Sequence, residues 1–521
     1  MIPDVVDDRP AGGAPRTHLG TLVAGCLAVA LAQIGLVLPA AINGVIQSTL
    51  RASGSELSWV SDAFLVPIAM TSLTFGLLGD RYGRKKILVG GAGAMALGYL
   101  VSATSGAIWQ LWAGQAICGI GAAALFASSL AVITAATPDA ASRARGLAAW
   151  TTALSTGALI APPLSGFVVE LGSFHWAFGV VGVLALVVAV LSAWLARESS
   201  APEGRSMDWP GQITIAAGLL ALLFGVIEGP TLGWGSPMVL AAFASSIALF
   251  AAFVLIENRT EAPMLRLSLF RIPGFSAASI VAVIGMFGFL GGAYALSIRL
   301  GVIQHQSPLR TAVPFVIVQG ITPFIWPLLV RLLHRVGPRV MLVTGLVALA
   351  VAQLWLRALP VDDPRLPPML VPLVLMGLGF GLLVSAITAA AVNVVPIRLA
   401  GMASATTSVV RDLGQTLGPA LIGTIALSHA GVVLAGVLDG AGLTEAQRQV
   451  VDAVSAEGGP LAVATAPLGP VSQIVAPLAR EALAQGYDIG FLVSALACLA
   501  AAGIAAVFVR KETDNGAIRQ L

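Results

Sequence analysis

Fourteen apolar stretches of about 20 residues divide this chain, and they limit its possible folds more than any other feature. A helix needs about 20 apolar residues to cross the hydrocarbon core of a bilayer. Backbone groups that face lipid must also find hydrogen-bond partners within the protein, as they do in an α-helix. We therefore predict an all-α membrane protein with fourteen transmembrane helices. The expected helices cover residues 18–42, 57–78, 87–106, 108–135, 144–168, 174–196, 212–229, 237–257, 274–298, 311–334, 338–357, 368–393, 401–427 and 488–510.

The composition excludes several functional classes. Of the 521 residues, 57% are hydrophobic and only 10% are charged, whereas soluble domains carry about 25% charged residues. A net charge of +3 gives no reason to expect a nucleic-acid partner. The sequence contains no Walker-type phosphate loop, so we do not expect ATP to drive the protein directly. It also lacks a His and Cys cluster with metal-ligand spacing, so we expect no metal site and no cofactor.

The distribution of Lys and Arg predicts the orientation. Connections after even-numbered stretches hold most of the basic residues, which are retained on the cytoplasmic side of membranes. Both termini are therefore expected to be cytoplasmic. Lysine occurs only at positions 85, 86 and 511 while Ala and Gly are abundant, which indicates a bacterial source and hence the bacterial cytoplasmic membrane.

A weak internal repeat predicts how the stretches are grouped. Residues 80–84 and residues 334–339 are both turns that contain Arg-x-Gly, at equivalent places in two sets of helices. Such repeats are expected of transporters built from two related halves. The predicted divisions are a cytoplasmic tail (1–17), a six-helix bundle (18–196), a linker with two inserted helices (197–257), a second bundle (258–427), an outer loop (428–487), a last helix (488–510) and a cytoplasmic tail (511–521).

The loop at 428–487 carries local helix signals. Thr444 and Gln447 have the spacing of a capping box, and Val450, Val451 and Val454 follow at helical spacing. We predict a helical hairpin on the outer face. A disordered loop is the alternative, because Gly458, Gly459 and Pro460 interrupt the pattern.

Residues 76–86, here called the basic loop, read Gly-Leu-Leu-Gly-Asp-Arg-Tyr-Gly-Arg-Lys-Lys. The glycines permit a tight reversal between two helices. This loop resembles the signature between helices 2 and 3 of the major facilitator superfamily, with every polar position matched. The resemblance implies a gate or latch between the two halves, and the alternative is a solvated turn that only sets topology. The residues concerned are Gly79, Asp80, Arg81, Gly83 and Arg84.

The stretch at 144–168 contains a second motif. Gly157, Pro162, Pro163 and Gly166 resemble the antiporter signature of helix 5 in this superfamily, with Ala161 and Ser165 in place of two glycines. Small residues let helices approach closely, and prolines remove backbone hydrogen bonds. We expect a kinked pivot or seal; the alternative is a bent membrane helix without a special role.

Further segments, including 58–86 and 401–418, resemble the fourteen-helix branch of the drug:proton antiporter family, in particular exporters of quaternary ammonium compounds. The resemblance implies proton-coupled efflux of lipophilic, often cationic, small molecules by alternating access, carried out by a monomer in the bilayer. It covers nearly the whole chain. The family pattern is broken at Ala30, where an Asp is usual, at Gln115, where an Arg is usual, and at Gln319, where an acid can occur. These departures put proton coupling in question.

The remaining charges inside the stretches are functional candidates, because a charge in a membrane span costs about 2.5–3.5 kcal/mol on insertion scales. Asp62 has no neighbouring cation in the sequence, so burial favours its neutral form and makes it the better proton carrier. Arg411 and Asp412 are the other candidates. The alternatives are an interfacial helix cap for Asp62 and a structural ion pair between helices for Arg411 and Asp412.

A substrate cavity is expected to involve Trp59, Gln115, Trp150 and Gln319, although membrane Trp residues more often serve in packing or in interfacial belts. Arg299 is expected to extend its side chain to the outer surface. Three rival functions stay open. They are a transporter of lipid or neutral lipophiles with weak or no proton coupling, a nutrient importer, and a non-transporting scaffold or sensor.

Overall fold

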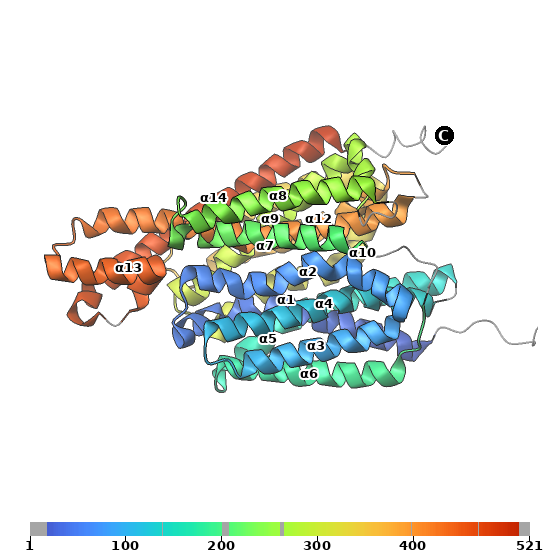
Figure 1. Ribbon diagram of the computed structural model, residues 1–521, viewed down its shortest axis with the longest axis horizontal. Coiled ribbons are helices and arrows are strands. Elements are labelled where there is room, and N and C mark those ends of the chain that lie inside the picture. Colours follow the sequence, from blue (N-terminus) through green and yellow to red (C-terminus); the bar gives the residue numbers. More distant parts are fainter. Residues whose placement is uncertain are drawn as a thin grey trace, which may run out of the picture.

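The computed structural model describes residues 18–137, 139–200, 208–260, 265–396, 399–466 and 468–509. The two predicted tails, 1–17 and 511–521, lie outside these residues. The described part is almost entirely helical (Figure 1), which confirms the all-α prediction. Its helices are α1 (Leu19–Leu50), α2 (Gly54–Tyr82), α3 (Arg84–Ala103), α4 (Ile108–Ala135), α5 (Ala140–Glu170), α6 (Phe174–Leu195), α7 (Trp209–Leu232), α8 (Pro237–Arg259), η1 (Leu267–Arg271), α9 (Pro273–Ile298), η2 (Arg299–Ile303), α10 (Pro308–Ala358), η3 (Pro367–Met369), α11 (Leu370–Val392), α12 (Ala400–Leu438), α13 (Glu445–Thr465), η5 (Gly469–Val471) and α14 (Ser472–Phe508).

Thirteen of the described helices are long and apolar enough to cross a membrane. One of them, α10, has 51 residues and contains Gly337 in a non-helical conformation (φ 77°, ψ 166°). Both parts of α10 pack against α11, since Val318 approaches Gly377 and Gly345 approaches Gly379. The chain therefore reverses at Gly337, where the sequence predicts the turn between two stretches. The total of fourteen crossings stays a prediction.

The helices form two halves, α1–α6 and α9–α14 (Figure 1). Close backbone approaches hold each half together. A Cβ atom on Gly121 of α4 would lie 2.5 Å from the carbonyl oxygen of Gly91 of α3, and one on Gly414 of α12 would lie 2.3 Å from that of Val283 of α9. Because only glycine fits at such crossings, the glycine content of the chain is used for helix packing.

The inserted pair α7–α8 covers a seam between the halves. An apolar cluster joins Val66 of α2, Leu219 and Leu223 of α7, and Ala420 of α12. Ser55 of α2 also donates a hydrogen bond to the carbonyl of Ile227 in α7, at 3.1 Å. The pair is thus packed against one helix of each half, as Figure 1 shows.

Residues 428–487 are helical over most of their length. Thr444 and Gln447 form the expected capping box at the start of α13. The flanking helices differ from the prediction, because α12 continues to Leu438 and α14 begins at Ser472. Every fourth residue of the α12 extension (Ala430, Leu434, Leu438) is buried. One face of the extension therefore packs against its neighbours. The extensions and α13 project beyond the bundle at one end (Figure 1).

Candidate functional site

The two halves meet at the end of the bundle that carries α13, here called the α13 end. Asn43 of α1 donates to the Ser297 hydroxyl of α9 (3.0 Å), and Ser297 in turn donates to the carbonyl oxygen of Ala40 (2.5 Å). A Cβ atom on Gly44 would lie 2.2 Å from the carbonyl oxygen of Gly301 in η2. The α13 end is therefore closed by direct contact between α1 and the end of α9.

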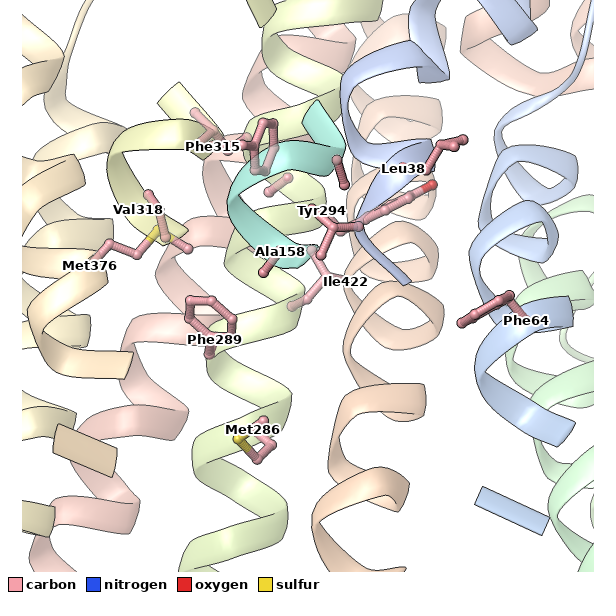
Figure 2. Packing of buried hydrophobic residues seen from close by; sticks show 14 of the residues in the cluster. Leu38, Phe64, Ala158, Met286, Phe289, Tyr294, Phe315, Val318, Met376 and Ile422 are labelled. Atoms are coloured by element: carbon pink, nitrogen blue, oxygen red, sulfur yellow. The ribbon is translucent and has the colours of Figure 1, made fainter. Parts of the chain in front are cut away.

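A single apolar cluster continues this closure toward the middle of the molecule. It contains Leu38 and Ala158 from the first half and Tyr294, Phe315 and Ile422 from the second, as Figure 2 shows. Apolar side chains packed in this way exclude water from the seam between the halves.

The basic loop lies at the opposite end, here called the basic end, and its hydrogen bonds with other described residues stay within the first half. Asp80 accepts from Arg84 Nε (3.0 Å) and Nη2 (2.9 Å). The carboxylate of Glu198, just after α6, accepts from the backbone N–H of Lys85 (3.0 Å). Gly83 makes the reversal with φ 112°, and a Cβ atom there would lie 2.6 Å from the Glu198 carboxylate.

The prediction that Gly79 also forms the reversal is wrong. Gly79 lies inside α2, and its carbonyl oxygen accepts from the N–H of Gly83. The guanidinium of Arg81 lies 5.5 Å from the centre of the Tyr82 ring. The turn thus depends on one glycine, because only Gly83 has a left-handed φ.

Replacing Asp80 by Asn should reduce transport at least tenfold without unfolding the protein. The Asp80–Arg84 pair is partly exposed, so it contributes under about 1 kcal/mol to folding. If Asp80 acts as a latch, it does so in the state in which the basic end is closed, so its loss slows transport and not folding. Transport rate and melting temperature of the purified variant are the measurements.

Asp363→Asn is the matched control for Asp80→Asn. Asp363 lies outside the membrane-spanning segments, and its hydrogen bonds with Arg365 lower its pKa to about 2. Asp363→Asn therefore also removes a carboxylate that is paired with an Arg, but at a site far from the basic loop. Normal transport by a well-expressed Asp80→Asn protein would contradict the latch hypothesis.

The four motif residues of α5 lie on two different contacts. A Cβ atom on Gly157 would lie 2.4 Å from the carbonyl oxygen of Ala30, so Gly157 packs α5 against α1 within the first half. A Cβ atom on Gly166 would lie 2.8 Å from the carbonyl oxygen of Pro308 in α10, so Gly166 joins the two halves. Pro162 and Pro163 lie between these contacts, inside α5.

Asp62 is completely buried on α2, and neither carboxylate oxygen has a hydrogen-bond partner among the described residues. The helix is capped elsewhere, because Ser53 and Glu56 form a capping box at its start. The alternative of an interfacial cap is therefore wrong. A buried carboxylate without a partner is strongly disfavoured in its ionised form, so the arrangement suits a group that carries a proton.

Arg411 and Asp412 lie on α12 and contact each other at 3.5 Å. Gln415 also donates to Asp412, at 3.3 Å. The Asp412 side chain is 14% exposed and that of Arg411 is 34% exposed. The pair is formed within one helix, so the alternative of an ion pair between helices is not what the structure shows.

The expected cavity residues lie in separate places. Gln115 is fully buried between α4 and α3, where it donates to Ser102 (3.2 Å), so the structure does not place it on a cavity. Trp59 donates to Glu228 of α7 (2.8 Å). Trp150 donates to Ser129 of α4 (3.0 Å), and Gln319 is half-buried on α10. These residues do not form one site.

An apolar pocket lies instead where α2, α7, α8 and α12 meet. Its volume is about 60 Å³. Neither its place nor its lining was predicted, because the residues come from three distant parts of the chain, namely α2, the α7–α8 pair and α12. They are Ala69, Met70, Leu73, Ile215, Leu219, Phe250, Val409 and Leu413.

Arg299 was expected to reach the outer surface, and this is wrong. It is 3% exposed, and its guanidinium donates to the carbonyl oxygens of Leu356 (2.7 Å), Leu359 (2.6 Å) and Pro360 (3.0 Å). Asp488 of α14 lies 3.9 Å away. Arg299 therefore satisfies the unpaired carbonyls at the end of α10, which the sequence could not reveal.

Arg299→Met should destabilise the protein by about 3–5 kcal/mol, because it leaves three carbonyl oxygens without their donor and Asp488 without its ion-pair partner. Thermal unfolding in detergent measures the effect. The exposed Arg310 on α10 provides the control, since Arg310→Met removes a cation of the same end. Equal melting temperatures for the two variants would contradict this role of Arg299.

Comparison with known proteins gives consistent matches. The sequence model of the Major Facilitator Superfamily matches residues 23–419. The tetracenomycin C resistance and export protein of Streptomyces glaucescens is 26% identical over 521 residues, covering 99% of this chain and 96% of the relative. The multidrug efflux pump LfrA of Mycolicibacterium smegmatis is 28% identical, covering 90% of this chain and 91% of the relative.

Solved structures agree in fold. A bacterial homologue of the human lysosomal transporter Spinster, in an inward-facing and occupied conformation, has a TM-score of 0.65 at 16% identity, covering 97% of this chain and 99% of that one. The POT family transporter PepTSo has a TM-score of 0.62 at 13% identity, covering 95% of this chain and 98% of that one. At these identities the likeness concerns the fold alone.

Proposed function

This chain belongs to the Major Facilitator Superfamily, and from that premise we propose that it exports small lipophilic compounds, including antibiotics, by alternating access. The relatives support the direction of transport, because their names describe export of tetracenomycin C and multidrug efflux. In this proposal the basic end faces the cytoplasm of a bacterium and the α13 end faces outward, because Lys and Arg are retained inside. The monomer is the working unit.

The observation that carries the proposal is the closure of the α13 end over Asp62. The halves are in direct contact there through Gly44 and Gly301, and the buried Asp62 has no described partner. A transporter closed at its outer end, with an acid sealed in the seam, corresponds to an inward-facing or occluded stage of the cycle. Asp62 then brings in the proton that drives export, while the more exposed Asp412 is the second acid.

A drug-susceptibility panel tests the export function. The gene is expressed in an efflux-deficient bacterial host, and growth inhibition is measured with lipophilic cations and with neutral antibiotics. We expect at least a fourfold rise in the inhibitory concentration for one class. Empty vector and a Gly44→Leu variant serve as controls. Unchanged susceptibility throughout, together with no flux in proteoliposomes, would overturn the proposal.

The second candidate is transport of lipid or neutral lipophiles without proton coupling. One observation favours it: the two positions where the family usually carries charge are neutral here. Ala30 is packed beneath Gly157, and Gln115 is buried on Ser102. Proteoliposomes distinguish the candidates, because only proton antiport gives uphill substrate flux from an imposed pH gradient.

A further inference from the structure

The helices α2 and α12 face each other along the seam in a regular antiparallel register. A Cβ atom on Gly54 would lie 2.4 Å from the Leu427 side chain, and one on Gly423 would lie 2.5 Å from the Ser58 hydroxyl. Moving four residues toward the C-terminus of α2 therefore corresponds to moving four residues toward the N-terminus of α12. Continuing this register places Asp62 opposite Pro419, one turn deeper than Ser58 and still on the seam.

Tyr294 of α9 lies at the α13 side of Asp62. Its ring is 5% exposed, and its hydroxyl lies 3.1 Å from the Ser58 hydroxyl of the opposite half. The rings of Tyr294 and Tyr487 of α14 lie 6.4 Å apart. A Cβ atom on Gly423 would also come within 3.3 Å of the Tyr294 ring, so the glycine makes room for it. Tyr294 therefore joins α9 to α2 directly above the buried acid.

This placement makes the Ser58–Tyr294 hydrogen bond sensitive to the charge of Asp62. Neutral Asp62 is compatible with a dry, closed seam. Ionised Asp62 needs donors, and the hydroxyls of Ser58 and Tyr294 are hydrogen-bond donors close to it along the seam. A carboxylate is a stronger acceptor than a hydroxyl, so it draws these donors away from the bond that joins the halves.

We propose that Tyr294 is the positioning residue that couples the protonation of Asp62 to closure of the α13 end. This inference rests on the proposed function and adds a named residue to it. With Asp62 protonated, Tyr294 bonds to Ser58 and the α13 end stays closed. With Asp62 ionised, Tyr294 turns its hydroxyl to the carboxylate while keeping its own proton, and the contact between the halves weakens.

Few charged side chains lie on the described helices around Asp62, and the α2–α12 register places the cation Arg411 two turns away from it. In sequence, α1 and α9 contain no acidic or basic side chain, and α2 has none between Asp62 and Asp80. The titratable and charged side chains on the helices packed against α2 and α9 include Cys26 on α1, Glu56 on α2, Tyr99 on α3, Cys118 on α4, Glu228 on α7, Arg411, Asp412 and His429 on α12, and Arg480, Glu481, Tyr487 and Asp488 on α14, besides Tyr294 on α9 itself.

Hydrogen exchange of the intact protein in lipid nanodiscs tests the proposal. The readout is deuterium uptake of residues 294–303, corrected for the intrinsic pH dependence of exchange. In the unmodified protein we expect uptake to rise at least tenfold from pH 5.5 to pH 8.5, as Asp62 ionises and the end opens. Asp62→Asn should stay protected at both pH values.

Tyr294→Phe removes only the hydroxyl. We expect its uptake at pH 5.5 to come within threefold of the unmodified protein at pH 8.5, with little further change as the pH rises. Tyr99→Phe is the matched control, because Tyr99 is a buried tyrosine of the first half whose hydroxyl has no described partner. It should retain the full pH profile. In the Asp62→Asn background, Tyr294→Phe should loosen the end without restoring pH dependence.

An unaltered pH profile in Tyr294→Phe would overturn the proposal, as would an equal change in Tyr99→Phe. Substrate export measured in proteoliposomes of the unmodified protein keeps the two questions apart. Export with a normal Tyr294→Phe profile refutes the coupling role alone, whereas absence of export refutes the proposed function.

Discussion

Gly44→Leu should abolish export while leaving the protein folded. A Cβ atom on Gly44 would already lie 2.2 Å from the Gly301 carbonyl oxygen, and this neighbour is backbone that cannot rotate away. Overpacking of this kind costs about 1–3 kcal/mol, and occasionally more. Since 1.4 kcal/mol is a factor of ten, the population closed at the α13 end should fall by about five- to 150-fold, and the transport cycle should stall.

Export rate in proteoliposomes and labelling of the α13 end measure this effect together. Labelling of a single cysteine introduced at Ala40 should rise in Gly44→Leu as export falls. The control is Gly431→Leu on α12, because a Cβ atom on Gly431 meets no neighbour within 4 Å. If Gly44→Leu exports at the normal rate, the contact with Gly301 does not form part of the cycle.

The helices and their grouping could be predicted from the sequence because a membrane span carries its own signal. About 20 apolar residues in succession leave few alternatives to a helix, and the repeat at residues 80–84 and 334–339 indicates two halves. The capping box of Thr444 and Gln447 was equally local. Each of these signals lies within a few neighbouring residues.

The site was less predictable, because its contacts join residues far apart in the chain. Gly44 and Gly301 are ordinary glycines in the sequence until α1 is placed beside η2. Arg299 was misread because its acceptors are carbonyls at the end of α10. Asp62 could be identified as a functional candidate from its charge alone, whereas Tyr294, to which we propose that it is coupled, carries no charge and could not be identified from the sequence.

Burial also separates the polar residues that are candidates for the site. Gln115 occupies the position of the usual Arg, yet it lies inside the first half with Ser102. The two acidic candidates also differ in burial, because Asp62 is completely buried whereas the Asp412 side chain is partly exposed. If both carry protons, they do so at different stages, and Asp62 is the one that the closed α13 end isolates.

Asp62→Asn should therefore separate proton coupling from substrate movement. The amide is uncharged at every pH, so the variant mimics the protonated state and allows the α13 end to close without a proton. We expect uphill export driven by a pH gradient to be lost for neutral and cationic substrates alike, with at least a 100-fold lower rate. Substrate exchange without a gradient should survive, although at a lower rate than normal, because the α13 end of this variant stays closed for longer.

The substrate dependence of the same variant decides between two roles of this acid. If Asp62 bound cationic substrates directly, Asp62→Asn would weaken transport of cations and spare neutral compounds, because only the cations lose an electrostatic partner. Asp412→Asn is the comparison, as it removes a carboxylate that already has Arg411 and Gln415 as neighbours. Unaltered uphill export of both substrate classes by Asp62→Asn would mean that the buried acid carries no proton, and the coupling would then have to run through Asp412 or be absent.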